Sequence, residues 1–189
     1  MNDNIRALAN LVARLSYRKG TFRLASGRES DFYVDVKQTV FTAAGSELVG
    51  RALCDRLQAA AVTSVGGMAV GAIPLVSAAL SEAARRGYGL DGFFVRKEVK
   101  DHGTSAKIDG RFDVSATIAL VEDVVTTGES TLRAIEAVEA AGGNVSLIVA
   151  VVDREENDGM ARLRERAPDV QALLTRADIL AAVDQGSSR

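Results

Sequence analysis

The chain has 189 residues, 47% of them hydrophobic, and a formal net charge of −2 at pH 7. This length suits one α/β domain, and the hydrophobic fraction is ample for a buried core. A charge this close to zero gives no electrostatic basis for general nucleic-acid binding. No apolar run is long enough to span a membrane, and the single cysteine cannot form an internal disulfide.

The first sixty residues follow a different pattern from the rest of the chain. Apolar side chains at helical spacing predict a helix over residues 5–17. Residues 21–30 have the composition of a loop, residues 31–36 that of a strand, and residues 46–60 that of a second helix. We expect residues 1–60 to form a hood or arm over one edge of the main sheet. Because the N-terminus lacks the long apolar core of a signal peptide, we expect a cytoplasmic protein.

Strand and helix patterns alternate from residue 62 onward. Such alternation predicts a parallel sheet with helices on both faces and right-handed crossovers. We place an α/β core at residues 61–182 and a frayed tail at residues 183–189, within a single domain. The predicted strands cover residues 62–65, 92–95, 117–121, 145–152 and 170–174, and the predicted helices cover residues 74–86, 129–141, 158–166 and 176–182.

The segment 118–131, IALVEDVVTTGEST, carries the strongest functional signal. An apolar strand leads to the adjacent acids Glu122 and Asp123, and a Thr-Thr-Gly turn leads to a helix that begins near Glu129. Backbone N–H groups of such a turn and the positive end of the helix bind phosphate. The carboxylates suit ribose hydroxyls or a hydrated magnesium ion. The alternative is an ordinary strand-to-helix turn, but adjacent carboxylates repel each other unless a positive group lies nearby.

A long polar segment, KEVKDHGTSAKIDG, occupies residues 97–110. A solvated surface loop and a mobile lid both fit this composition. A lid would bring Arg96, Lys97, Lys100 and His102 to a pyrophosphate group, neutralise its charge and exclude water. The neighbouring phosphate motif favours the lid.

Four further motifs accompany the phosphate motif in order along the chain. They are FxLxSGxxSxFYVD at residues 22–35, GGxxxGAxP at 66–74, FVRKxxKxHG at 94–103 and VDR at 152–154. Together they resemble the type I phosphoribosyltransferases, which use phosphoribosyl pyrophosphate (PRPP), and in particular the members that act on orotate. In those members the motif at 66–74 is the pyrophosphate-binding turn.

This resemblance implies a parallel sheet flanked by helices, an N-terminal hood or arm and a long flexible catalytic loop. It implies transfer of ribose 5-phosphate from PRPP to orotate, which gives orotidine 5′-monophosphate and pyrophosphate in pyrimidine (UMP) biosynthesis. The implied cofactor is Mg²⁺, with no direct protein ligand and held mainly by substrate oxygens and waters. The implied assembly is a homodimer with shared active sites, in which the catalytic loop reaches the neighbouring subunit.

The resemblance also assigns roles to individual residues. Lys100 and His102 would be the catalytic residues that stabilise the leaving group, and Thr126 and Arg154 would bind orotate. The residues expected to bind PRPP are Arg96, Lys97, Lys100, His102, Glu122, Asp123, Val124, Val125, Thr126, Thr127, Gly128, Glu129 and Ser130.

The chain departs from this family at two positions, and two other functions stay open. Many members have lysine where this chain has Ala25 and Val70, and Lys37 is a candidate for the missing charge. One alternative is a phosphoribosyltransferase for another nucleobase, and the other is a PRPP-sensing regulator without catalysis. Arg154 favours a small acidic pyrimidine, and the intact loop with near-neutral charge disfavours the regulator.

Overall fold

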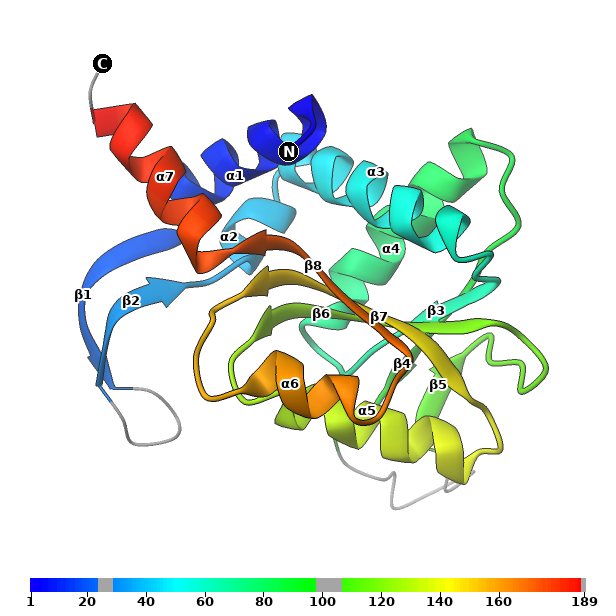
Figure 1. The fold of residues 1–189 in the computed structure, drawn as a ribbon. Coiled ribbons are helices and arrows are strands. Elements are labelled where there is room, and N and C mark those ends of the chain that lie inside the picture. Colours follow the sequence, from blue (N-terminus) through cyan, green and yellow to red (C-terminus); the bar gives the residue numbers. More distant parts are fainter. Residues whose placement is uncertain (24–28, 98–106, 188–189) are drawn as a thin grey trace.

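The computed structural model describes residues 1–23, 29–97 and 107–187 (Figure 1). The strands are β1 (Tyr17–Arg23), β2 (Glu29–Val34), β3 (Ser64–Gly66), β4 (Asp91–Val95), β5 (Ile108–Gly110), β6 (Ile118–Val125), β7 (Val145–Asp153) and β8 (Asp169–Thr175). The helices are α1 (Asp3–Leu15), α2 (Lys37–Val40), α3 (Ala43–Ala59), α4 (Ala72–Arg85), α5 (Glu129–Ala140), α6 (Gly159–Arg164) and α7 (Arg176–Ser187).

The main sheet has six strands in the order β5-β4-β3-β6-β7-β8. The pairs β4–β3, β3–β6, β6–β7 and β7–β8 are parallel, as the alternating pattern predicts. The edge strand β5 pairs antiparallel with β4, so the sheet is mixed and not wholly parallel. This strand was predicted as part of the polar segment because three residues are too few to show a period.

Helices cover both faces of this sheet, with α3 and α4 on one side and α5 and α6 on the other (Figure 1). Successive side chains of a strand point to opposite faces, and the core follows this rule. Leu147 and Val149 of β7 pack in the core cluster that contains α1, α3 and α4. Ile148, which lies between them, packs in the second cluster with α5 and α6. Burial on both faces explains why these strands are continuous apolar runs in the sequence.

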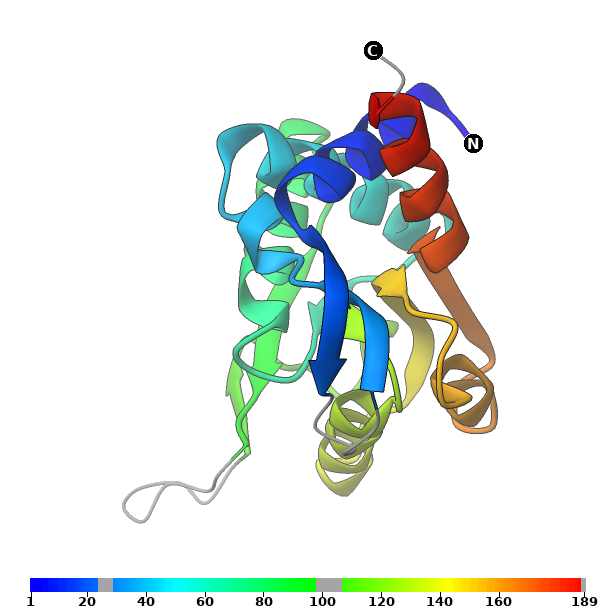
Figure 2. The same cartoon turned by 90° about the vertical axis from the view of Figure 1, so that its left-hand side faces the viewer.

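Strands β1 and β2 form a separate antiparallel hairpin. Figures 1 and 2 show it beside the edge of the main sheet at which β7 and β8 end. The predicted loop over residues 21–30 is therefore partly wrong, since β1 continues to Arg23 and β2 begins at Glu29. The sequence YRKGTFR of β1 is mostly polar, and its strand conformation comes from pairing with β2, where Tyr17 opposes Val34.

Several element ends differ from the predicted ones. Strand β6 continues to Val125, so the two acids lie within the strand and not beyond its end. Helix α7 continues to Ser187, which corrects the frayed tail expected from residue 183 as far as the structure describes it. This helix packs against α1, and that contact orders it. Helix α1 begins where the Asn2 side chain accepts a hydrogen bond from the N–H of Ile5.

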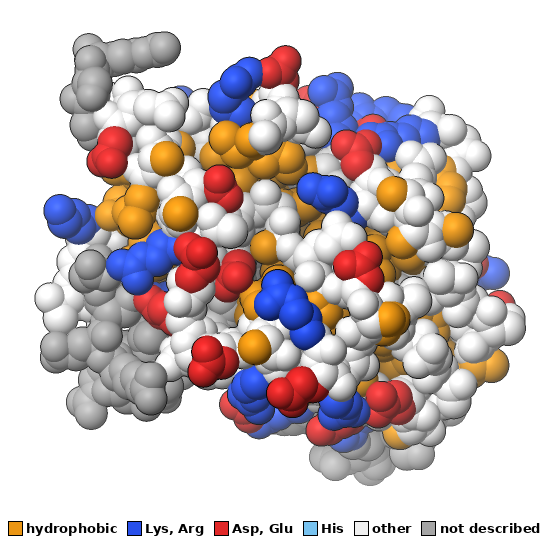
Figure 3. Space-filling model, in the orientation of Figure 1, with side chains coloured by type: hydrophobic (Ala, Val, Ile, Leu, Met, Phe, Trp, Pro, Cys, Tyr) orange, Lys and Arg blue, Asp and Glu red, His pale blue; other side chains and the backbone are white. Residues whose placement is uncertain are grey.

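The surface carries charges of both signs. Figure 3 shows Lys and Arg side chains interspersed with Asp and Glu over the face drawn there. Across the described parts of the chain, no helix combines the length and the apolar character needed to cross a membrane.

Candidate active site

The turn between β6 and α5 encloses a cavity of about 160 Å³. It lies at the N-terminus of α5, where unpaired backbone N–H groups and the helix dipole favour an anion. Gly128 adopts a left-handed conformation with φ of 74°, which a glycine accommodates without strain. The cavity is lined by Glu122, Val124, Val125, Thr126, Thr127, Gly128, Glu129, Ser130 and Thr131. Apart from Asp123, they include every residue of the run 122–130 that was expected to bind PRPP, and Thr131 is an addition.

Helix α6 contacts the backbone of this turn. The Arg162 guanidinium donates a hydrogen bond to the backbone carbonyl of Thr127 at 2.7 Å. Gly159 lies so close to the turn that a Cβ atom there would come within 2.4 Å of the Thr126 carbonyl oxygen. Sequence analysis did not identify either residue, because nothing in the pattern of α6 shows which side chain faces the turn.

Glu122 is buried, with 6% of its surface exposed, and accepts a hydrogen bond from the Thr131 hydroxyl at 2.8 Å. Burial, together with the neighbouring charge of Asp123, raises the pKa of Glu122 to about 8. At neutral pH this carboxyl group is therefore mostly protonated. A neutral Glu122 removes one negative charge from the wall of the cavity, which reduces its repulsion of a phosphate.

The raised pKa of Glu122 predicts a pH-dependent stability. The folded state holds this proton more tightly than the unfolded chain, whose pKa is near 4.5. The stabilisation is thus complete below pH 4.5 and is lost as pH rises through about 8. Glu122→Gln, which can still accept the Thr131 hydrogen bond, should remove this loss. The free energy of unfolding would be measured with urea at pH 5.5 and 8. Relative to the wild type, that of Glu122→Gln should be higher at pH 8 than at pH 5.5 by on the order of a few kcal/mol. A difference that is constant with pH would contradict the protonated Glu122.

The Asp123 side chain has different neighbours from the Glu122 side chain. Its carboxylate lies 3.4 Å from the Lys37 ammonium, which also pairs with Asp35 at 2.8 Å. Burial acts to raise the pKa of Asp35, but hydrogen bonds from Lys37 and Gln38 outweigh it and hold the pKa below its usual value. A positive group therefore lies beside the acidic pair, as the sequence argument required. This group belongs to α2; from the sequence, Lys37 was a candidate for a missing phosphate-binding charge and not a predicted partner of Asp123.

Arg154 follows β7 at the same edge of the sheet, and its backbone N–H donates a hydrogen bond to the Val125 carbonyl at 3.1 Å. Arg154 is 4% exposed and contacts the β1–β2 hairpin. Its guanidinium donates to the Phe32 carbonyl at 2.8 Å, pairs with Glu156 at 3.0 Å and lies over the Phe32 ring. Arg176 pairs with the same Glu156 carboxylate at 3.4 Å and contacts the same ring. Two arginines thus share one carboxylate, an arrangement that spacing in the sequence does not reveal.

The structure does not bring all the predicted PRPP residues together. Arg96 and Lys97 line a separate cavity of about 290 Å³ with Lys107 and Arg133. Within the described parts of the chain, this cavity shares no lining residue with the one at the β6–α5 turn. Lys100 and His102, the predicted catalytic residues, and Ala25 lie outside the described residues.

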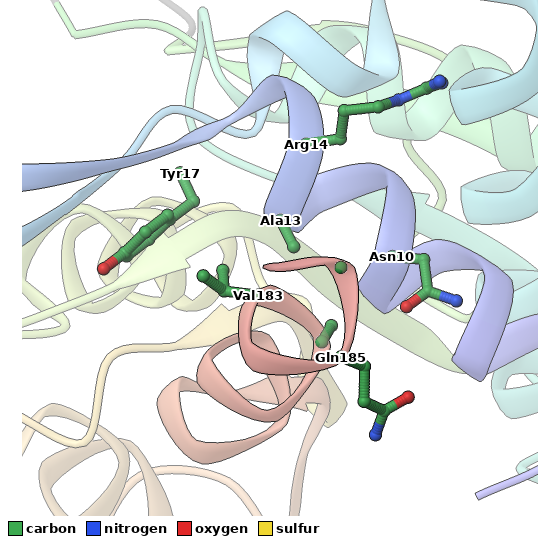
Figure 4. Close-up of a pocket in the computed structure, with 8 residues that line it drawn as sticks. Asn10, Ala13, Arg14, Tyr17, Val183 and Gln185 are labelled. Atoms are coloured by element: carbon green, nitrogen blue, oxygen red, sulfur yellow. The ribbon is translucent and has the colours of Figure 1, made fainter. Parts of the chain in front are cut away.

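A larger cavity of about 510 Å³ lies between α1 and α7 (Figure 4). Ala13 and Tyr17 line one side and Val183 the other, with Arg14 as the cation of the lining set. Among the described residues, no acidic side chain and no helix N-terminus contributes to it, so its chemistry does not suit a phosphorylated substrate. The smaller cavity at the β6–α5 turn is the better candidate for the active site.

No family model matches the chain. An orotate phosphoribosyltransferase of Sorangium cellulosum is 40% identical over 176 residues, which are 92% of this chain and 91% of the relative. The chain belongs to the orotate phosphoribosyltransferase family. It is a pentosyltransferase of pyrimidine biosynthesis, so the sequence-based prediction of family and activity is confirmed.

Solved structures of the orotate phosphoribosyltransferase family share the fold. The Mycobacterium tuberculosis enzyme in complex with Fe(III) dicitrate matches with a TM-score of 0.80 and 34% identity, covering 93% of this chain and 98% of the other. The same enzyme in complex with PRPP matches with a TM-score of 0.74 and 31% identity, covering 93% and 98%. The predicted α/β architecture of this family is therefore confirmed.

Proposed function

We propose that the β6–α5 turn binds the 5′-phosphate of PRPP and that Arg154 and Thr126 bind orotate. The observation that carries this proposal is the cavity at the N-terminus of α5, directly beside the end of β7. Residues 126–130, which carry backbone N–H groups and hydroxyl side chains, line that cavity. Arg154 is joined to β6 through the Val125 carbonyl, so a base held by Arg154 would lie next to the ribose.

The remaining roles follow from the reaction. The bond between ribose C1 and the pyrophosphate oxygen breaks, and pyrophosphate leaves with the bonding electrons. A ring nitrogen of orotate bonds to C1 and loses its proton, which passes to the departing pyrophosphate or to water. Glu122 and Asp123 would hold the ribose hydroxyls, which position C1 as positive charge develops on the sugar. The Arg154 guanidinium would pair with the orotate carboxylate, because its planar fork suits a planar anion. Arg96, Lys97, Lys100 and His102 would stabilise the leaving pyrophosphate.

Magnesium enters this proposal with the substrate. Within residues 1–23, 29–97 and 107–187, no group of three His, Cys, Asp or Glu side chains could hold a metal ion. Asp123, whose side chain is 15% exposed, fits a hydrated ion bound mainly by PRPP oxygens and waters. Such an ion would supply positive charge to the pyrophosphate. Loss of turnover on chelation, restored by Mg²⁺, tests this part.

A homodimer with shared sites and a cytoplasmic location complete the proposal. Within one chain, Arg96 and Lys97 line a cavity separate from the phosphate turn, which supports a role for this segment in a neighbouring site. Sedimentation equilibrium that finds a monomer at assay concentrations would contradict the dimer. Fractionation that places the protein outside the cytoplasm would contradict the location.

The substrate assay tests the proposal as a whole. Orotate absorbance should fall only when PRPP and a divalent metal are both present, because the phosphate turn and the acidic pair act on PRPP. Uracil lacks the carboxylate for Arg154 and should react at least about tenfold more slowly. Adenine and hypoxanthine should not react. Turnover of a purine without turnover of orotate would contradict the assignment of Arg154.

A further inference from the structure

The turn of residues 66–71, between β3 and α4, lies against the acidic pair of β6. A Cβ atom on Gly71 would lie 2.9 Å from the nearest Asp123 carboxylate oxygen, so this turn and Asp123 are in direct contact. The turn reads Gly-Gly-Met-Ala-Val-Gly and carries no cation. Val70, at its outer corner, is 67% exposed. A pyrophosphate at this turn would therefore need a positive charge from another part of the chain.

Lys37 is placed to supply that charge. It is the first residue of α2, and the hairpin that precedes α2 brings it to the carboxyl edge of the sheet. Among the described residues, it is the cation that forms an ion pair with Asp123, at 3.4 Å, with a closer pair to Asp35 at 2.8 Å. Its side chain is 45% exposed, so the ammonium group is open to solvent and to a ligand.

We propose that Lys37 binds the pyrophosphate group of PRPP, in place of a cation on the 66–71 turn. The inference rests on the proposed binding of PRPP at the β6–α5 turn. An ammonium group has three donors. With Asp35 as an anchor, Lys37 can keep one donor on that carboxylate and direct another to pyrophosphate. When ribose hydroxyls bind Asp123, the long 3.4 Å contact is the one that the lysine gives up.

A purely structural role would give the same contacts, so the test must separate the two ends of PRPP. Ribose 5-phosphate contains the sugar and the 5′-phosphate but lacks pyrophosphate. Binding of PRPP and of ribose 5-phosphate would be measured by calorimetry, with magnesium and without orotate. For Lys37→Gln, PRPP affinity should fall about tenfold to a hundredfold, while ribose 5-phosphate affinity changes by less than about threefold. Lys37→Arg should recover most of the PRPP affinity because it keeps the charge.

Matched variants control for charge and folding. Lys19→Gln removes an exposed lysine from β1 and should leave both affinities unchanged. The double variant Asp35→Asn with Lys37→Gln removes both charges of the closer pair. It would be used in place of Lys37→Gln if Lys37→Gln alone does not fold. Compared with Asp35→Asn alone, this double variant should show the same selective loss of PRPP affinity.

Two results would overturn the inference. One is unchanged PRPP affinity in Lys37→Gln or in the double variant. The other is an equal loss of affinity for PRPP and ribose 5-phosphate, which would mean that Lys37 positions Asp123 and does not bind pyrophosphate. Failure of the wild-type protein to bind PRPP would instead contradict the proposed function, so the two failures are distinguishable.

Discussion

Arg154→Ala is expected to abolish most of the turnover of orotate while PRPP binding changes little. Arg154 is 4% exposed, and its guanidinium bonds to Phe32 of the β1–β2 hairpin, so a carboxylate that pairs with it is shielded from water. Loss of such a desolvated pair costs about 2–5 kcal/mol. This corresponds to a fall in kcat/KM for orotate of roughly thirtyfold to several thousandfold. Steady-state kinetics with each substrate varied in turn would measure it.

The controls for Arg154 must separate binding from folding. Removing Arg154 leaves Glu156 with Arg176 as its described ion-pair partner, so the variant should also be less stable. Arg154→Lys keeps the charge but lacks the planar fork. It should restore the free energy of unfolding more fully than kcat/KM for orotate. Arg166→Ala removes a surface pair with Glu139 and should leave kinetics unchanged. An unchanged KM for orotate in folded Arg154→Ala would assign Arg154 a structural role.

Gly159→Ala is expected to weaken PRPP binding at least about tenfold, although the residue lies on α6 and not in the phosphate motif. The added Cβ atom would lie 2.4 Å from the Thr126 carbonyl oxygen, which is backbone, so the turn itself must move. A displaced turn no longer directs its N–H groups at the phosphate. Overpacking of this kind also lowers the free energy of unfolding by about 1–3 kcal/mol. Calorimetry with PRPP and ribose 5-phosphate should show similar losses for both.

Gly89→Ala is the matched control for this substitution. A Cβ atom at Gly89 meets no atom within 4 Å, so the variant should keep both PRPP affinity and stability. The Gly159 and Lys37 variants together test the two ends of PRPP. Gly159→Ala should weaken binding of both PRPP and ribose 5-phosphate, whereas Lys37→Gln should weaken binding of PRPP alone. Wild-type PRPP affinity in Gly159→Ala would show that the 5′-phosphate does not depend on this turn.

Apart from β5, the type of each main-sheet element and its order along the chain could be predicted from the sequence, because their signals are local. Strands such as β7 are buried on both faces, so they appear as continuous apolar runs. The phosphate turn was predictable for a similar reason. A strand, a turn with Gly128 and a helix N-terminus follow one another along the chain, so residues adjacent in sequence line the same cavity.

Tertiary structure decided which side chains from distant segments meet. The polar strand β1 is a strand because β2 pairs with it, and that hairpin carries Lys37 to Asp123. Chain folding likewise brings Phe32 from the hairpin to Arg154. These contacts depend on strand pairing and helix packing between parts of the chain that no local period connects.

The same limit applies to the electrostatics of the acidic pair. Sequence alone showed that Glu122 and Asp123 are adjacent and need a compensating charge. Burial raises the pKa of Glu122 to about 8, so this group is mostly protonated at neutral pH, and the Lys37 ammonium pairs with Asp123. A pKa depends on the depth of burial and on charges within a few ångströms, and both exist only once the chain has folded.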